Sequence, residues 1–334
     1  MLASVGAIVV GAILGRLLDR SGFSLARAFQ WGRIQGDGDA FRAYWLALAL
    51  LWLLAAVAPR AFSRDYSQAL LISPLAAMLA GFVAGLALRM LDADPQSLAV
   101  GAGRFRPVAW IGLTGWIVGV LVGGHGPMVP LMSWIRGAGP VEIRDLTVGG
   151  LFALSPAVLG PLLAIGITGW LLRAPVTIRP GIPEWPMQAA GLALLAFAGW
   201  GLAWLGGEGG VPNGVSAVEE IWHGFAEGRL WLRPSLLAGV GLLAYGVSRG
   251  VAPAARDPGK VEITGRAAAG VLLGLSSALA GGDPAAHAIF GCSRLALPSM
   301  VYVVALWCGG WLMGLLEWKT LGRPGSRPSR GHGV

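Results

Sequence analysis

The sequence predicts an all-α polytopic membrane protein with about nine transmembrane helices. Three observations support this fold class. Of the 334 residues, 55% are hydrophobic and only 13% are charged. The mean hydropathy is +0.66, which is outside the usual range of soluble globular proteins. Apolar segments of about 13 to 22 residues recur along the chain, as helices that cross a bilayer require, with tilt or local thinning accommodating the shorter ones.

The apolar segments follow one another with short polar connections between them. They cover residues 2–18, 44–58, 70–91, 107–122, 151–172, 187–205, 234–247, 267–279 and 299–316. Together they predict a single transmembrane domain over residues 1–318, with pseudo-repeats at roughly 1–150 and 151–318. Residues 319–334 are rich in Gly, Pro and Arg, and this composition predicts a basic cytoplasmic tail without regular structure.

The distribution of basic residues predicts the orientation. With nine spans, most of the 25 Lys and Arg residues fall in the odd-numbered connections and the C-terminal tail. Cytoplasmic loops carry the excess of Lys and Arg, so we expect a periplasmic N-terminus and a cytoplasmic C-terminus in a bacterial inner membrane. Attraction of the basic loops to anionic membrane lipids accounts for the net charge of +8, so no nucleic-acid partner is expected.

A polar segment separates the last two predicted spans. Residues 280–300 place Asp283, His287 and Arg294 between strongly apolar stretches, and a Gly pair followed by Pro284 interrupts any helix there. An acid, an imidazole and a guanidinium so close to hydrocarbon need a partner, a water-filled cavity or a ligand. A broken polar element between two spans is typical of transporter substrate sites, although an ordinary interfacial loop has the same composition.

Units of similar design occur three times. Residues 15–29, 85–101 and 270–291 each run from a span of small residues into Asp or Arg, then Gly or Pro, then a short amphipathic piece. They predict an internal repeat with re-entrant or half-length helices. In the third unit Asp283 and His287 are four residues apart, so on a helix they would face the same side. Either they pair and only pin the turn, or they contact a substrate or proton.

The sequence offers little for catalysis or cofactor binding. Its two Cys and four His follow no metal-binding or haem-binding spacing, so we expect no enzyme activity, cofactor or metal site. Cys292 is a candidate reactive thiol, because the nearby Arg294 favours a thiolate. Cys308 lies within the last predicted span and is expected to be a small buried residue. The acidic residues and His223 between residues 206 and 233 are interpreted as a solvated outer loop.

Two short motifs in the chain combine helix breaks with particular side chains. The first comprises Gly22-Phe23-Ser24, then Arg27-Ala28-Phe29, then Gly36-Asp37-Gly38. The second runs from Ala278 through Gly281-Gly282-Asp283 and His287 to Leu297-Pro298-Ser299. These motifs and the spacing of the spans resemble YeeE/YedE-type sulfur transporters, which take up thiosulfate or related compounds. The resemblance covers most of the chain.

The resemblance implies an hourglass-like protein in which short helices converge on a narrow centre and pass the anion along a line of cysteines. This chain departs from that pattern, because Ser24 and Asp283 stand where the family has cysteines and residues 88–92 contain none. The candidate substrate-binding residues are Ser24, Arg27, Asp283, His287 and Cys292, although Cys292 is displaced by nine residues and does not replace a cysteine of the family.

Three functions follow as hypotheses. The first is a transporter of a small sulfur-containing, anionic or other polar solute, for which the expected partners are membrane lipids and other membrane subunits or a cytoplasmic sulfur-carrier protein. The second is a non-transporting structural subunit of a larger membrane complex, derived from the same family. The third is a membrane-embedded enzyme or redox anchor that uses His125 and His287.

Overall fold

The computed structural model describes the chain as helices joined by turns, with one isolated β-bridge between Thr147 and Ala296. The described residues are 2–29, 38–57, 73–138, 147–151, 154–173, 184–207, 212–228, 232–251 and 259–321. The long helices are α1 (Leu2–Ser21), α3 (Gly38–Val57), α5 (Pro74–Leu91), α7 (Pro107–Gly124), α10 (Pro156–Leu171), α11 (Trp185–Leu205), α13 (Pro234–Ser248), α14 (Lys260–Ala280) and α15 (Leu297–Leu321). The short helices are α2 (Leu25–Phe29), α6 (Pro95–Gly103), α8 (Val129–Gly137), α9 (Val148–Leu151), α12 (Gly214–Glu227) and the π-helical turn η3 (Ala286–Gly291).

Each of the nine predicted spans coincides with one of the long helices. Within the described residues, seven segments are long and apolar enough to cross a membrane, and one of them runs through α5 and α6 together. Helices α10 and α13 are apolar but shorter. The predicted fold class, an all-α polytopic membrane protein, is therefore confirmed. Residues 322–334 of the predicted tail lie outside the described residues, as do Gly36 and Asp37 of the first motif.

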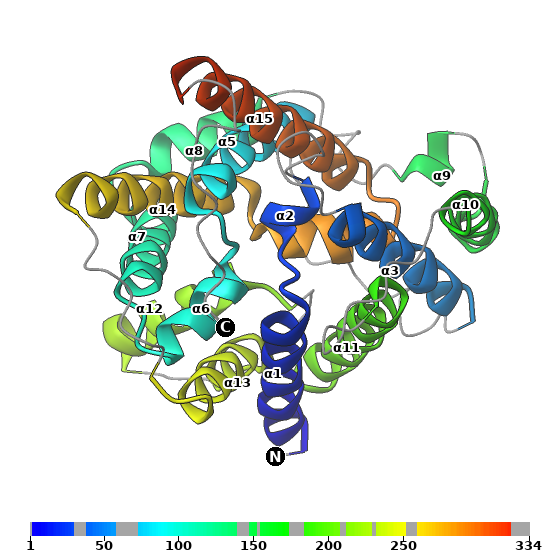
Figure 1. The fold of residues 1–334 in the computed structure, drawn as a ribbon, viewed down its shortest axis with the longest axis horizontal. Coiled ribbons are helices and arrows are strands. Elements are labelled where there is room, and N and C mark those ends of the chain that lie inside the picture. The colour runs from blue at the N-terminus through cyan, green and yellow to red at the C-terminus, as the bar shows by residue number, and fades with distance from the viewer. Residues whose placement is uncertain are drawn as a thin grey trace.

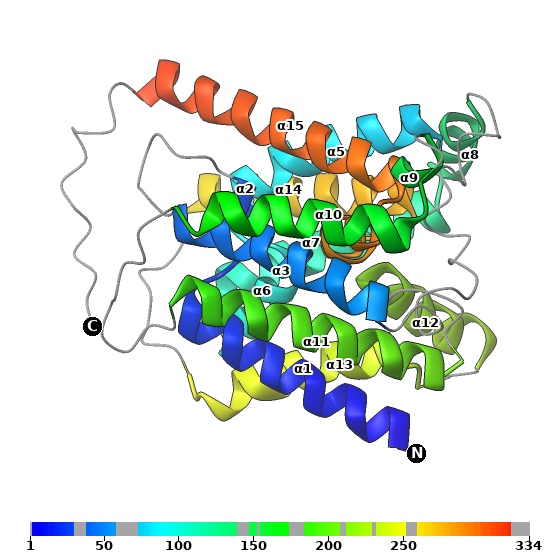
Figure 2. The same cartoon turned by 90° about the vertical axis from the view of Figure 1, so that its right-hand side faces the viewer.

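The order long helix, break, short helix, long helix occurs four times in the described chain. The four units are α1–α2–α3, α5–α6–α7, α11–α12–α13 and α14–η3–α15. Three of the breaks are predicted from the sequence, whereas the one between α11 and α12 falls in the stretch interpreted as a solvated loop. In Figure 1 the long helices surround α2, and Figure 2 shows several of them lying side by side along one direction.

The four units pack together in two pairs, the first unit with the third and the second with the fourth. Helix α1 packs against α13, and α11 packs against α3, so each long helix of the first unit contacts a long helix of the third unit. Helix α5 packs against α15 while α14 packs against α7, so the second and fourth units do the same. The predicted pseudo-repeat boundary near residue 150 stays a prediction.

Small residues allow the long helices to approach closely. At the crossing of α7 and α14, a Cβ added at Gly119 would collide with the carbonyl of Val271, and one added at Gly274 would collide with the carbonyl of Trp116. Small residues at helix crossings are the usual basis of packing in membranes. The crossing also brings the indole of Trp116 within 3.2 Å of the Ser277 hydroxyl, to which it donates a hydrogen bond. This hydrogen bond fixes the C-terminal end of α14, after which the fourth break begins.

Candidate functional site

The first break follows α1 and leads into the short helix α2. Ser24 caps this helix, since its Oγ accepts a hydrogen bond from the backbone N–H of Arg27 at 3.1 Å. Ser24 is buried, whereas the Arg27 side chain is exposed and donates to the carbonyl of Gly22 at 2.9 Å. The two predicted site residues of this motif therefore face different surroundings: Ser24 the interior, and Arg27 the surface.

The second break, between α5 and α6, places a buried carboxylate at the ends of two helices. Asp94 caps α6, and its Oδ1 accepts from the N–H of Ser97 at 2.8 Å. Its Oδ2 accepts from the N–H of Leu25, the first residue of α2, at 2.7 Å. Asp94 is only 2% exposed. A single side chain thus joins the N-termini of two short helices from different units.

The third break ends at Asn213, which caps α12. Its Oδ1 accepts from the N–H of Val215 at 2.9 Å, and its Nδ2 donates to the carbonyl of Gly281 at 3.0 Å. Its backbone N–H donates to the hydroxyl of Ser235 at 3.1 Å. The interpretation of this stretch as a solvated outer loop is wrong in part, because Glu220 and Asn213 are both buried and Asn213 contacts the fourth break.

The fourth break contains Asp283, which is 1% exposed. Its Oδ1 accepts from the N–H of Ala286 at 2.8 Å, at the start of η3. Its Oδ2 accepts at 3.0 Å from the N–H of Gly214, the first residue of α12, and at 3.0 Å from the Gln96 amide of α6. Position 214 must be small, because an added Cβ would lie 2.7 Å from the Asp283 carboxylate and 2.8 Å from Trp116.

The four caps form one buried centre, defined by Ser24, Asp94, Asn213 and Asp283. Asp94 caps its own helix and bonds the N–H that follows Ser24, while Asp283 caps its own helix and bonds the N–H that follows Asn213. Helix N-termini carry partial positive charge and unpaired N–H groups, which stabilise anions. Gln96 connects the two carboxylates, because it lies on α6, which Asp94 caps, and donates to Asp283 at 3.0 Å. We call this arrangement the cap centre.

His287 lies beside the cap centre but bonds other groups. Its Nδ1 lies 3.1 Å from the Ser299 hydroxyl and its Nε2 lies 3.2 Å from the carbonyl of Ala280. Its ring stacks on Tyr302, with the ring centroids 4.3 Å apart. Asp283 and His287 therefore bond different partners and not each other. The imidazole holds the fourth break against α14 and α15.

Neither cysteine forms a hydrogen bond with one of the four caps in the described part of the chain. Cys292 is buried beyond η3, where its thiol lies 3.8 Å from the carbonyl of Ser299. The neighbouring Arg294 guanidinium stacks over the Trp200 ring, 4.1 Å from its centroid. Cys308 is exposed on α15, so the expectation that it is buried is wrong. An almost wholly apolar helix gives no sequence signal of which face it turns outward.

His125 and His223 lie beside each other, with their ring centroids 5.8 Å apart. His125, at the C-terminal end of α7, stacks on Trp222 with 5.5 Å between the centroids. His223 lies 2.9 Å from a carboxylate oxygen of Glu227 on the exposed side of α12. Within the described ranges, no group of three or more His, Cys, Asp or Glu side chains is placed to hold a metal ion.

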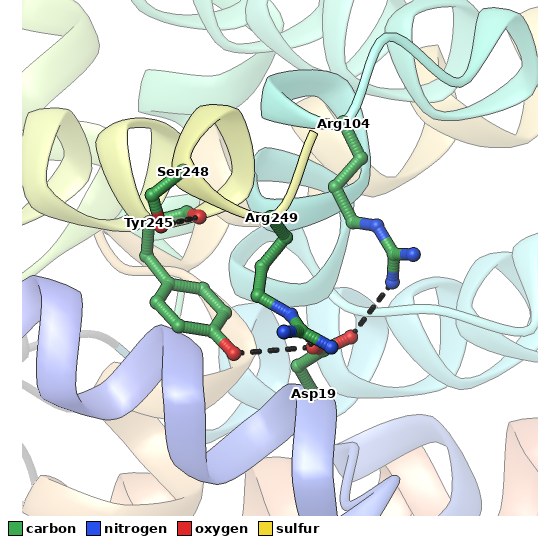
Figure 3. Close-up of polar contacts among 5 residues, drawn as sticks. All are labelled: Asp19, Arg104, Tyr245, Ser248 and Arg249. Atoms are coloured by element: carbon green, nitrogen blue, oxygen red, sulfur yellow. Dashed lines mark hydrogen bonds and ion pairs between the residues drawn. The ribbon is translucent and has the colours of Figure 1, made fainter. Parts of the chain in front are cut away.

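An ion-pair cluster joins three helix ends at one side of the molecule (Figure 3). Asp19 of α1 accepts from Arg104 at 2.9 Å, from Arg249 at 3.2 Å and from the Tyr245 hydroxyl at 3.1 Å. Arg104 directly follows α6, and Arg249 directly follows α13. The contacts place the first, third and seventh connections on one side, as nine spans require. Which side faces the cytoplasm stays a prediction.

Two residues of the cap centre, Asp94 and Asn213, are absent from the sequence-based expectations, and so is Gln96, which donates to Asp283. A signal for one of them exists, because Asp94-Pro95 and Asp283-Pro284 share the pattern of an acidic N-cap followed by Pro at the first helical position. The same reasoning that selected Asp283 therefore applies to Asp94. Gln96 carries no local signal, since its role depends on the approach of a distant segment.

The fold and the cap centre define a polytopic helical membrane protein with broken helices meeting in its interior, which is a class that includes many transporters. No family model matches the sequence. The chain is similar to the thiosulfate transporter TsuA of Spirochaeta thermophila, with 22% identity over 338 residues that cover 93% of this chain and 98% of the relative. The match confirms the resemblance that the two motifs indicate, and the chain is a divergent relative of a thiosulfate transporter.

Proposed function

We propose that the protein is an inner-membrane transporter of a small sulfur-containing or other polar solute, and that the solute passes through the cap centre. One observation carries this proposal. Backbone N–H groups at the N-termini of broken helices converge on buried polar side chains inside a bundle of apolar helices. Broken helices of this kind form the solute sites of many transporters, and their N-termini favour anionic groups. The similarity to a thiosulfate transporter along almost the whole chain supports the same class.

In this proposal the predicted site residues have separate roles. Ser24 and Asp283, which replace the cysteines of the family, contact the solute at the cap centre. His287 positions the fourth break through its bonds to α14 and α15. The exposed guanidinium of Arg27 attracts an anionic solute at the entrance. Cys292 contributes packing behind η3 rather than a thiol for the solute.

Uptake of radiolabelled thiosulfate tests the proposal. Wild type, Asp283→Ala and His287→Ala are compared in a bacterial strain that lacks its own thiosulfate importers. The matched controls are Glu227→Ala and His223→Ala, because this exposed pair has the same residue chemistry away from the cap centre. We expect wild type and both controls to take up thiosulfate and the two site variants to lose most of it. Background uptake in all five strains would refute thiosulfate as the solute.

The replacement of the family's cysteines by Ser24 and Asp283 favours one alternative, a non-transporting structural subunit of a larger membrane complex. Purification in mild detergent separates the two functions. A stable partner in fixed stoichiometry, without uptake by wild type, supports the structural subunit. A transporter is expected to purify as a monomer or homo-oligomer, and a cytoplasmic sulfur-carrier protein is expected to associate only transiently.

A further inference from the structure

The exposed surface of α1 changes from apolar to basic along a single stripe. The exposed residues of this helix are Leu2, Val5, Val9, Ile13, Arg16 and Arg20. Their spacing of three or four residues places them on one helix face. The apolar part suits the hydrocarbon of a bilayer, and the two guanidiniums follow at the end of the helix. Long basic side chains at such an end reach the headgroup layer.

Helix α13 packs beside α1 and has a similar pattern. The exposed residues of this helix are Val240, Ala244, Val247 and Ser248. The half-exposed Arg249 follows directly after them. The two helices meet at this end, because a Cβ added at Gly15 would lie 3.0 Å from the Tyr245 ring, and the Tyr245 hydroxyl donates to Asp19. Apolar stripes on both helices therefore lead to the same basic end.

The connection between α6 and α7 adds a third basic element. Arg104, Phe105 and Arg106 make up this connection. The end of α6 lies against α13, because a Cβ added at Gly103 would collide with a backbone carbonyl of that helix. Arg104 then reaches Asp19, as Figure 3 shows. Phe105 is 57% exposed, and an exposed aromatic residue between two arginines is typical of segments at the membrane interface.

This end of the two helices has more cations than the protein itself neutralises. Asp19 already pairs with Arg104 at 2.9 Å and with Arg249 at 3.2 Å. Among the described residues, Arg16 and Arg106 form no ion pair. Burial and the neighbouring Arg104 guanidinium lower the pKa of Arg106, which reflects the repulsion between like charges. An anion bound among these guanidiniums relieves that repulsion.

We propose that this end of α1 and α13 binds the phosphate of an anionic phospholipid, with Arg16, Arg106 and Arg249 around the headgroup and the acyl chains along the apolar stripes. Guanidiniums bind phosphate oxygens through paired hydrogen bonds. Basic pockets between transmembrane helices bind lipid headgroups in this way. The apolar stripes that lead to the guanidiniums favour a lipid over a free oxyanion, which makes no contact with them. The inference does not depend on the proposed function, because it involves no transported solute.

Native mass spectrometry of the delipidated wild type tests the lipid site without any variant. Phosphatidylglycerol, which is anionic, is titrated in parallel with zwitterionic phosphatidylethanolamine of the same acyl chains. We expect one phosphatidylglycerol to bind about tenfold more tightly or better. Equal affinity for the two lipids would overturn the proposal. Inorganic phosphate is the third probe, in a thermal unfolding assay. If it stabilises the protein as much as phosphatidylglycerol does, the site takes a free oxyanion and the lipid proposal is wrong.

Arg16→Gln and Arg106→Gln test whether the affinity comes from these guanidiniums. Neither residue has an ion pair within the described ranges, so both variants are expected to keep the melting temperature of wild type without lipid. Each is expected to bind phosphatidylglycerol about fivefold more weakly. Arg173→Gln is the matched control, since Arg173 is an exposed arginine after α10, which packs against α3. Wild-type affinity in both site variants, or an equal loss in the control, would overturn the proposal.

Discussion

Asp94→Ala tests whether the cap centre holds the broken helices together. The substitution removes both acceptors of the N–H groups of Leu25 and Ser97, which lie at the starts of α2 and α6. No other acceptor for these N–H groups appears among the described contacts, and Asp94 itself is only 2% exposed. The variant therefore leaves two donors unsatisfied in the interior of the protein.

The size of the effect follows from those two hydrogen bonds. A buried donor left without an acceptor costs about 1–3 kcal/mol, so two cost about 2–6 kcal/mol. At about 2 °C per kcal/mol, which is typical of the larger domains, the melting temperature falls by about 4 °C or more. Asp94→Asn retains a good N-cap oxygen and is expected to lose about half as much.

Tryptophan fluorescence during thermal unfolding in detergent provides the assay, since the chain has 15 Trp residues. The melting temperature is expected to be close to that of wild type in Glu227→Ala, lower in Asp94→Asn and lowest in Asp94→Ala. Glu227→Ala removes an exposed partner of His223 and so controls for loss of a carboxylate. Equal melting temperatures for Asp94→Ala and Glu227→Ala would show that the two N–H groups do not depend on Asp94, and the described cap centre would be refuted.

Three further changes address other parts of the account. Gly274→Leu places a side chain against the α7 backbone and is expected to abolish a monodisperse peak in size-exclusion chromatography, while Gly265→Leu on the same helix, with open space around it, leaves the peak unchanged. Asp19→Asn weakens the ion pair with Arg104 and is expected to cost about 1 kcal/mol in the melting assay, less at high salt; the same loss at every salt concentration would contradict an ionic origin. Tyr302→Phe removes a buried hydroxyl that has no hydrogen-bond partner within the described residues, so we expect an unchanged melting temperature. A fall beyond that of Glu227→Ala would show a missed hydrogen bond.

The sequence predicts the spans well, because hydrophobicity over about 20 residues is set by composition and needs no knowledge of tertiary contacts. It also selects two of the four cap residues, although as candidate substrate-binding residues and not as helix caps. Ser24 and Asp283 are found because each stands in a motif of a known family and next to a helix break. Asp94 follows the same Asp-Pro pattern as Asp283, but two residues are too common a signal to select it alone.

Other features depend on the approach of segments that are distant in the sequence. Asn213 lies in a stretch whose acidic residues indicate a solvated surface, and only its bond to Gly281 shows that one end reaches the interior. The four-residue spacing of Asp283 and His287 predicts a shared helix face. The backbone between them makes the expected α-type hydrogen bond, from the N–H of His287 to the carbonyl of Asp283 at 3.3 Å, yet the two side chains bond different partners. Local periodicity contains no information on which distant groups each side chain meets.

Thiosulfate uptake into proteoliposomes that contain only the purified protein tests the central claim most directly, because no other importer or partner is present. The account predicts saturable uptake by wild type, well above that of liposomes without protein, and a large loss in Asp283→Ala but not in Glu227→Ala. Wild-type uptake no higher than that of empty liposomes, at any pH between 5 and 8, would contradict thiosulfate transport through the cap centre.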